Sequence, residues 1–176
     1  LTQIGENIND KSYIASIIPK INQRNSDKAA NILGITFWQQ VKVLIEFDEK
    51  NINQISSLEE AVDFYIKHFY KVDGAIRKLY TSFLTQKEII GPLQSYYKNL
   101  VTIYLDKWFR YVEDYQSDQT GKIQEILDSH IEKTAIIVGD GVSWEFAQDI
   151  VSAFGKSDYE LTKSHIFAGL PSETEH

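Results

Sequence analysis

Residues 56–88 read SSLEEAVDFYIKHFYKVDGAIRKLYTSFLTQKE, and their apolar and aromatic side chains recur at steps of three and four. This spacing places them on one face of a long helix. The face consists of Leu58, Val62, Tyr65, Phe69, Val72, Ile76, Leu79 and Phe83. Ser57 and Glu60 have the spacing of a capping box, in which each side chain binds a free backbone N–H of the first turn. The stretch predicts an amphipathic helix that begins near Ser57, with Asp73 and Arg77 as an i,i+4 pair.

A second long helix is predicted after the Gly91-Pro92 break. Its apolar stripe consists of Leu93, Tyr97, Leu100, Tyr104, Trp108, Val112 and Tyr115. Two long helices joined by a short break are expected to pack antiparallel. Further helices are predicted over residues 28–47, with Phe37, Trp38, Val41, Leu44 and Ile45 facing inward, and over residues 122–131. Residues 1–131 are therefore predicted to form a helical domain, with residues 117–121 (SDQTG) as the best linker candidate.

The pattern changes at Lys133. Residues 134–140 (TAIIVGD) form a continuous apolar run with β-branched residues, which is typical of a strand buried on both faces of a parallel sheet. Residues 142–155 predict a helix that ends at Gly155, and residues 164–169 (SHIFAG) predict a second strand. The predicted fold class is α+β overall, with a helical bundle in residues 1–131 followed in residues 132–176 by the opening strand–helix–strand of an α/β/α sheet.

Two strands do not make a stable buried sheet by themselves. Either the sheet continues beyond residue 176 or the helices cover it, and we expect the continuation. The chain begins with Leu1 and contains no methionine, which also favours a part of a longer protein.

Composition narrows the class of protein. Hydrophobic residues make up 43% of the chain, which is ample for a packed core, and the absence of cysteine excludes disulfides and thiolate metal sites. The lack of cysteine fits a cytoplasmic protein, which is what we expect. We expect no membrane span, because no apolar run reaches the roughly 18 residues of one, and the N-terminus does not resemble a signal peptide. The net charge of −7 argues against a broad phosphate-binding surface. An acidic balance suits the binding of a divalent metal, and a solvated acidic tail is the alternative.

Asp140 follows the first predicted strand and stands between Gly139 and Gly141. Ligands of open α/β sheets bind at the carboxyl ends of the strands, and a carboxylate there can hold a hard divalent cation. The alternative is that Asp140 caps the helix that begins near Val142. The segment contains neither a P-loop nor a dinucleotide-binding fingerprint.

The second predicted strand runs into Pro171-Ser172-Glu173-Thr174. A hydroxyl at the start of a helix gains from the positive helix end, and a serine or threonine oxygen becomes a useful nucleophile when a metal lowers its pKa. The alternative is again a helix N-cap.

Residues 135–147 (AIIVGDGVSWEFA) and 170–176 (LPSETEH) resemble the start of the PglZ domain, a branch of the alkaline-phosphatase superfamily. The shared pattern is an apolar strand that ends in aspartate, a helix with an early glutamate, and a second strand that runs into Pro-Ser-x-Thr. Residues 65–80 (YIKHFYKVDGAIRKLY) and 101–109 (VTIYLDKWF) are similar to the region that precedes the catalytic domain in PglZ proteins of bacteriophage exclusion (BREX) systems. The resemblance touches much of the chain through short motifs.

The resemblance implies a metal-dependent phosphatase or phosphodiesterase. Asp140 would match the first metal-binding aspartate of the superfamily. Thr174 would match the metal-bound hydroxyl that attacks phosphorus, with Ser172 as the second choice. Two divalent cations, usually zinc, would serve a phosphoester substrate, nucleic acid among the candidates, and other defence-system proteins would be partners. The superfamily takes further Asp and His ligands from later strands, so residues 1–176 alone are expected to be inactive.

Two other classes of protein remain open. The first is a non-catalytic interaction scaffold of a defence complex, in which the helices dock other proteins and residues 132–176 are an inactive remnant. An exposed apolar patch on the helices would favour this scaffold. The second is a receiver-like or nucleotide-binding sheet, which is disfavoured because receivers need a cluster of acids after the first strand and Asp140 has no adjacent acid.

Overall fold

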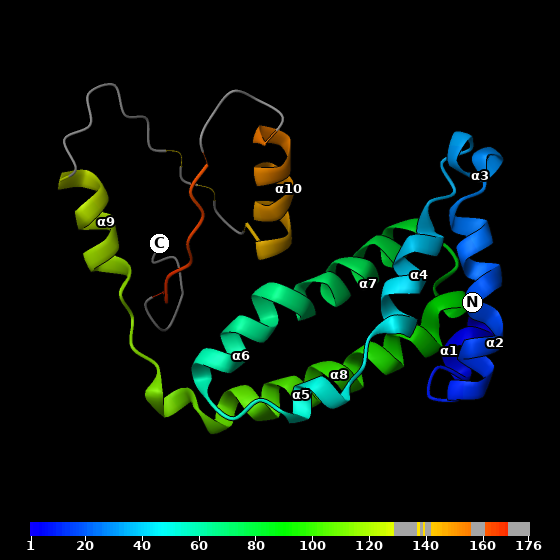
Figure 1. The fold of residues 1–176 in the computed structure, drawn as a ribbon, viewed down its shortest axis with the longest axis horizontal. Coiled ribbons are helices and arrows are strands. Elements are labelled where there is room, and N and C mark those ends of the chain that lie inside the picture. Colours follow the sequence, from blue (N-terminus) through cyan, green and yellow to red (C-terminus); the bar gives the residue numbers. More distant parts are fainter. Residues whose placement is uncertain (129–136, 138, 140–141, 156–160, 169–176) are drawn as a thin grey trace. The chain divides into compact units, whose positions relative to one another are not determined.

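The computed structural model describes residues 1–128, 137, 139, 142–155 and 161–168. Within these residues every regular element is a helix or a helical turn (Figure 1). The predicted α+β class is wrong, because the part of the chain that the structure describes contains no strand and no sheet. The chain divides into two compact units, Leu1–Arg110 and Tyr111–His176.

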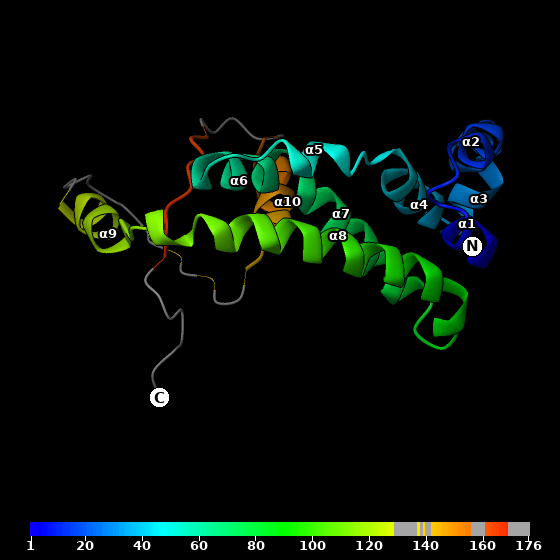
Figure 2. The ribbon, with the colours of Figure 1, turned by 90° about the horizontal axis from the view of Figure 1, so that it is seen from below.

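The first unit is a bundle of helices. Its α-helices are α1 (Thr2–Glu6), α2 (Lys11–Asn25), α3 (Lys28–Ile32), α4 (Phe37–Glu46), α5 (Lys50–Asn53), α6 (Leu58–Phe64), α7 (Tyr70–Ser82) and α8 (Gly91–Arg110). A π-helical turn, Tyr65–Phe69, joins α6 to α7, and a 3-10 turn, Lys87–Ile90, leads into α8. Figures 1 and 2 show α6 and α7 lying alongside α8 and running in the opposite direction. None of the described helices combines the length and apolar character needed to cross a membrane.

The core of this unit follows the predicted helix faces. Its fully buried side chains include Phe69, Val72, Ile76 and Leu79 from the long helical stretch, Leu93 and Leu100 from α8, and Val41 and Leu44 from α4. The ring of Phe69 stacks on Tyr104 of α8 with centroids 4.9 Å apart. Burial of each large apolar side chain stabilises the fold by about 1.5–3 kcal/mol. The long helical stretch, its buried face and its antiparallel packing on α8 are therefore confirmed.

The helix predicted over residues 28–47 is divided into α3 and α4. Gly34, between them, has a φ of 71°, a left-handed conformation that glycine adopts without steric cost. The buried side chains of α4 are Val41 and Leu44, as predicted, whereas Phe37 is only half-buried. One glycine thus turns a predicted single helix into two.

The cap of α6 differs from the predicted capping box by one residue. Ser57 Oγ accepts a hydrogen bond from the Glu60 backbone N–H at 3.1 Å, as predicted. The Glu60 carboxylate accepts from the backbone N–H and the hydroxyl of Ser56, at 2.8 and 2.7 Å, instead of from Ser57. These hydrogen bonds lower the pKa of Glu60. Both side chains still satisfy a backbone donor, which is what helix initiation requires.

The second unit contains a 3-10 turn, Val112–Asp114, and the helices α9 (Gln119–Asp128) and α10 (Trp144–Phe154). The helix predicted over residues 142–155 is confirmed as α10. The first predicted strand falls mostly outside the described residues. Residues 164–168 of the second predicted strand are described and have no regular secondary structure, while Gly169 lies outside the described residues.

Candidate functional site

Asp140, Ser172 and Thr174 all lie outside the described residues, so the predicted metal ligand and the two candidate nucleophiles are not placed. Their neighbours in sequence are described. These neighbours are α10, which begins four residues after Asp140, and residues 161–168, which end just before Gly169 and the Pro-Ser-Glu-Thr motif. These two segments, α10 and residues 161–168, are the described parts of the chain that lie nearest to the motifs in sequence.

The N-terminus of α10 has its own capping residue. The Ser143 side chain accepts a hydrogen bond from the Phe146 backbone N–H at 3.5 Å, and Ser143 has the extended backbone of an N-cap. The alternative interpretation of Asp140 as a helix cap stays a prediction, because Asp140 lies outside the described residues. Glu145 lies in the first turn and is 8% exposed, at the helix end where a negative charge is stabilised.

The segment 161–168 contacts α10 through a polar and aromatic cluster. Lys163 Nζ donates a hydrogen bond to Gln148 Oε1 at 2.8 Å and lies 5.6 Å from the centre of the Trp144 ring. The His165 ring meets the same indole edge-on, with centroids 6.3 Å apart. Trp144 thus contacts two side chains of the segment. Sequence periodicity gave no signal for this cluster, because its members come from a helix and from an irregular segment.

The carboxyl end of the same segment is fixed by residues 115–118. The Phe167 backbone N–H donates to Asp118 Oδ1 at 2.8 Å, and Ser117 Oγ donates to the Phe167 carbonyl at 3.1 Å. The Tyr115 hydroxyl donates to the Ala168 carbonyl at 2.7 Å. Backbone polar groups need such partners, and here side chains supply them where a neighbouring strand was predicted to do so. The residue that precedes Gly169 is therefore well anchored.

A buried carboxylate lies in the first unit. Asp73, in α7, is 8% exposed and accepts hydrogen bonds from the Tyr65 hydroxyl at 2.9 Å and from the Tyr97 hydroxyl at 3.0 Å. Burial, and then the negative charge of Asp73, raises the pKa of both phenols. Both tyrosines therefore stay protonated at neutral pH and remain hydrogen-bond donors to the carboxylate.

Asp73, Tyr65 and Tyr97 form a cluster, the Asp73 cluster, that connects three parts of the bundle. Tyr65 begins the π-helical turn, Asp73 lies beyond that turn in α7, and Tyr97 belongs to α8. Each carboxylate oxygen accepts from one phenol, so the cluster fixes the π turn and the position of α8 against α7. The helical spacing predicts a pair of Asp73 with Arg77, but it does not predict the burial of Asp73. The available signal was its place beside Val72 and Ile76, within the apolar face.

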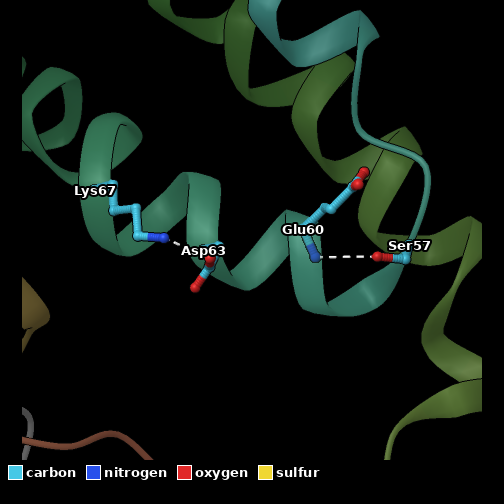
Figure 3. A network of polar contacts seen from close by, with 4 residues as sticks. All are labelled: Ser57, Glu60, Asp63 and Lys67. Atoms are coloured by element: carbon cyan, nitrogen blue, oxygen red, sulfur yellow. Dashed lines mark hydrogen bonds and ion pairs between the residues drawn. The ribbon is translucent and has the colours of Figure 1, made fainter.

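A shallow polar pocket of about 520 Å³ lies along α5 and α6. Its charged groups include Glu60, Asp63, Lys67 and His68, and Figure 3 shows Lys67 in contact with Asp63. In the part of the chain that the structure describes, no group of three or more His, Asp or Glu residues is placed to hold a metal ion. The predicted zinc site stays a prediction, because Asp140 and Thr174 are not among those residues.

No protein-family model, curated protein or solved structure matches this chain. The resemblance to the PglZ domain therefore rests on the two motifs at residues 135–147 and 170–176 and on the helical segments at 65–80 and 101–109.

Proposed function

We propose that this chain is part of a metal-dependent phosphoester hydrolase of the PglZ type that acts in prokaryotic anti-phage defence. Asp140 binds metal and Thr174 supplies the nucleophilic oxygen, with Ser172 as the second choice. The observation that carries the proposal is the order of the two motifs, Gly139-Asp140-Gly141 and Pro171-Ser172-Glu173-Thr174, on either side of α10. A cytoplasmic location and partner proteins of the same defence system belong to the proposal.

Two observations beside the motifs support this assignment. Ser143 is the capping residue of α10, so this helix does not require Asp140 as its cap. A carboxylate at position 140 suits a divalent cation, because carboxylate oxygens are favoured ligands of such ions. In addition, the hydrogen bonds at Phe167 and Ala168 anchor the chain six residues before Thr174. The chain is therefore held in place up to Ala168, the described residue that precedes the Pro-Ser-Glu-Thr motif.

The proposed chemistry is phosphoryl transfer through a covalent intermediate on Thr174. The Thr174 hydroxyl loses its proton and its oxygen attacks phosphorus, while the bond to the leaving-group oxygen breaks and that oxygen takes up a proton. Water then hydrolyses the bond between Thr174 and phosphorus, which releases phosphate from a monoester substrate or a phosphate monoester from a diester substrate. Zinc, when bound, would lower the pKa of the threonine hydroxyl and stabilise charge on the phosphoryl oxygens. Asp140 and Thr174 supply two oxygen donors, fewer than the three protein ligands of a catalytic zinc site, so further ligands are required.

We expect Asp140→Ala to lower the zinc content of the protein that carries this chain. The variant removes a carboxylate ligand, and the loss of a ligand weakens metal affinity by roughly tenfold or more. Zinc is measured by atomic emission after dialysis, for the wild type and for the variant. Asp149→Ala is the matched control, because Asp149 is an exposed aspartate of α10. Equal zinc in all three proteins would contradict the role of Asp140.

A non-catalytic scaffold is the second candidate, and a specific observation favours it. Large apolar side chains are exposed on both helices of the second unit: Ile123, Ile126 and Leu127 on α9, and Phe146, Ile150 and Phe154 on α10. Each set recurs at helical spacing and forms an apolar face. Exposed apolar faces mark surfaces that another protein covers. A wild-type protein that binds no zinc and shows no hydrolysis would favour the scaffold over the hydrolase.

A further inference from the structure

The end of α3 and the turn that follows it, residues 32–35, carry exposed aliphatic side chains. We call these four residues the α3 tip. Ile32 is 85% exposed, Leu33 is 74% exposed and Ile35 is 39% exposed. Figure 1 shows α3 at one end of the first unit, where α2 ends and α4 begins. Side chains as exposed as Ile32 and Leu33 project from the surface, so they are placed to enter a second molecule or a lipid layer.

Hydrogen bonds fix the backbone of the α3 tip. The Gly34 N–H donates to the Asn31 carbonyl at 3.1 Å, and the Ile35 N–H donates to the Ala30 carbonyl at 2.8 Å. Together with the φ of 71° at Gly34, these two bonds form a Schellman motif, which closes the C-terminal end of a helix. The tip therefore presents its aliphatic side chains from a preformed turn, which reduces the entropy that binding costs.

Three basic residues precede the α3 tip. Lys20 and Arg24 belong to α2 and Lys28 begins α3, and all three are exposed. None of them forms an ion pair with another described residue. The single acid of residues 20–36 is Asp27, which caps α3. This segment therefore has a net charge of +2, in a chain whose net charge is −7.

The other acids of α2 and α4 lie far from this end. The Arg24 guanidinium lies 4.5 Å from the centre of the Trp38 ring, which places the C-terminal end of α2 beside the start of α4. Asp10 caps the opposite end of α2, and Glu46 is the last residue of α4. At 1.5 Å per residue, both acids are roughly 14–21 Å away along the helix axes, beyond the Debye length of about 8 Å.

The neighbouring helix does not supply a compensating acid. The α7 helix packs against α4, and the ring of Phe83 at the end of α7 lies 5.1 Å from that of Phe37 at the start of α4. The exposed charged residues of α7 are all basic: Lys71, Arg77 and Lys78. The end of the bundle that carries the α3 tip is therefore locally positive.

This combination of residues fits an anionic lipid surface better than a protein. The centres of protein interfaces are enriched in aromatic residues and depleted of lysine. Surfaces that bind anionic lipid combine lysine and arginine with apolar side chains that enter the acyl boundary. The exposed apolar side chains of the α3 tip are all aliphatic, and two of the three cations that precede it are lysines.

We propose that the α3 tip docks the first unit on a bilayer surface that carries anionic lipid. Ile32 and Leu33 enter the boundary between headgroups and acyl chains, and the three basic side chains attract the headgroups. The contact is peripheral and uses none of the residues assigned to hydrolysis. It goes beyond the hydrolase proposal, and either proposal can fail without the other.

The test is flotation of the full chain with two kinds of vesicle. One contains phosphatidylcholine alone, and the other contains phosphatidylcholine and phosphatidylserine in equal parts. We expect at least roughly tenfold tighter binding to the anionic vesicles, because each basic residue near such a surface contributes a factor of about five. A higher salt concentration should reduce this difference, because salt screens the charges.

Variants at exposed positions separate the two contributions. The double variant Ile32→Ser, Leu33→Ser should weaken binding to anionic vesicles by roughly tenfold or more while the fold persists. Lys20→Gln and Lys28→Gln should each weaken it by a factor of roughly five and leave binding to neutral vesicles unchanged. Lys98→Gln, at an exposed lysine of α8, is the matched control and should change nothing.

A fluorescent probe distinguishes insertion from loose attraction. The chain contains no cysteine, so Leu33→Cys provides a single labelling site. An environment-sensitive dye at this site should shift its emission to the blue on anionic vesicles, and the same dye at Lys98→Cys should not. The proposal is overturned if both kinds of vesicle bind equally, if the double serine variant binds like the wild type, or if the two dyes respond alike. Absence of binding to either vesicle also overturns it, and would favour an acidic protein as the occupant.

Discussion

Thr174→Ala is expected to lower the hydrolysis of a phosphodiester such as bis-p-nitrophenyl phosphate by roughly a thousandfold or more. Removal of a nucleophile that acts together with its activating groups costs rate factors of this size or larger. Alanine has no oxygen that can attack phosphorus, so no phosphothreonine can form. The measurement is the steady-state rate of nitrophenol release by the zinc-loaded protein that carries this chain.

Three variants separate the role of Thr174 from other causes. Thr174→Ser retains a hydroxyl and should retain part of the activity, and Ser172→Ala should reduce the rate much less than Thr174→Ala. Thr162→Ala changes an exposed threonine of the described segment and should have no effect. If Ser172→Ala alone removes activity, Ser172 is the nucleophile. If all four variants match the wild type, neither hydroxyl takes part in the reaction.

Asp73→Ala is expected to lower the free energy of unfolding by about 3 kcal/mol. The substitution removes the acceptor of two phenols, and each buried or partly buried donor left unsatisfied costs about 1–3 kcal/mol. Tyr65 and Tyr97 are only half-buried, so water recovers part of that cost. The measurement is urea unfolding followed by circular dichroism.

A double-mutant cycle provides the control for Asp73. Tyr65→Phe and Tyr97→Phe should each destabilise the wild type, because each leaves the carboxylate with one donor fewer. The same substitutions should cost much less in the Asp73→Ala background, where the carboxylate is already gone. Additive effects, or a loss below about 0.5 kcal/mol for Asp73→Ala, would show that the cluster does not fix the bundle.

The helices were predictable from sequence because their signals are local. The apolar spacing in residues 56–88 defines the buried face that contains Phe69, and Ser57 marks the start of α6. The π-helical turn at Tyr65–Phe69 was not predicted, because it keeps the same residues near one face and changes only the hydrogen-bond pattern. The hydrogen bond from the Tyr65 hydroxyl to Asp73 spans that turn. The second donor to Asp73 is Tyr97, which lies 24 residues after Asp73 in the chain.

The second predicted strand failed for a different reason. A short run such as residues 164–168 can satisfy its backbone polar groups either in a sheet or against side chains, and periodicity does not distinguish the two cases. In the structure, Ser117 and Asp118 bind the backbone of Phe167, and Tyr115 binds that of Ala168. These contacts depend on tertiary structure, so no local sequence pattern predicts them. The predicted site residues Asp140, Ser172 and Thr174 were drawn from motifs and remain predictions.

The most direct test of the central claim is the rate of phosphodiester hydrolysis by the wild-type protein, measured with zinc bound, after chelation, and after zinc is restored. We predict that chelation abolishes hydrolysis, that zinc restores it, and that the helical bundle stays folded throughout. Hydrolysis that is unchanged by chelation, or absent with zinc bound, would contradict a metal-dependent hydrolase.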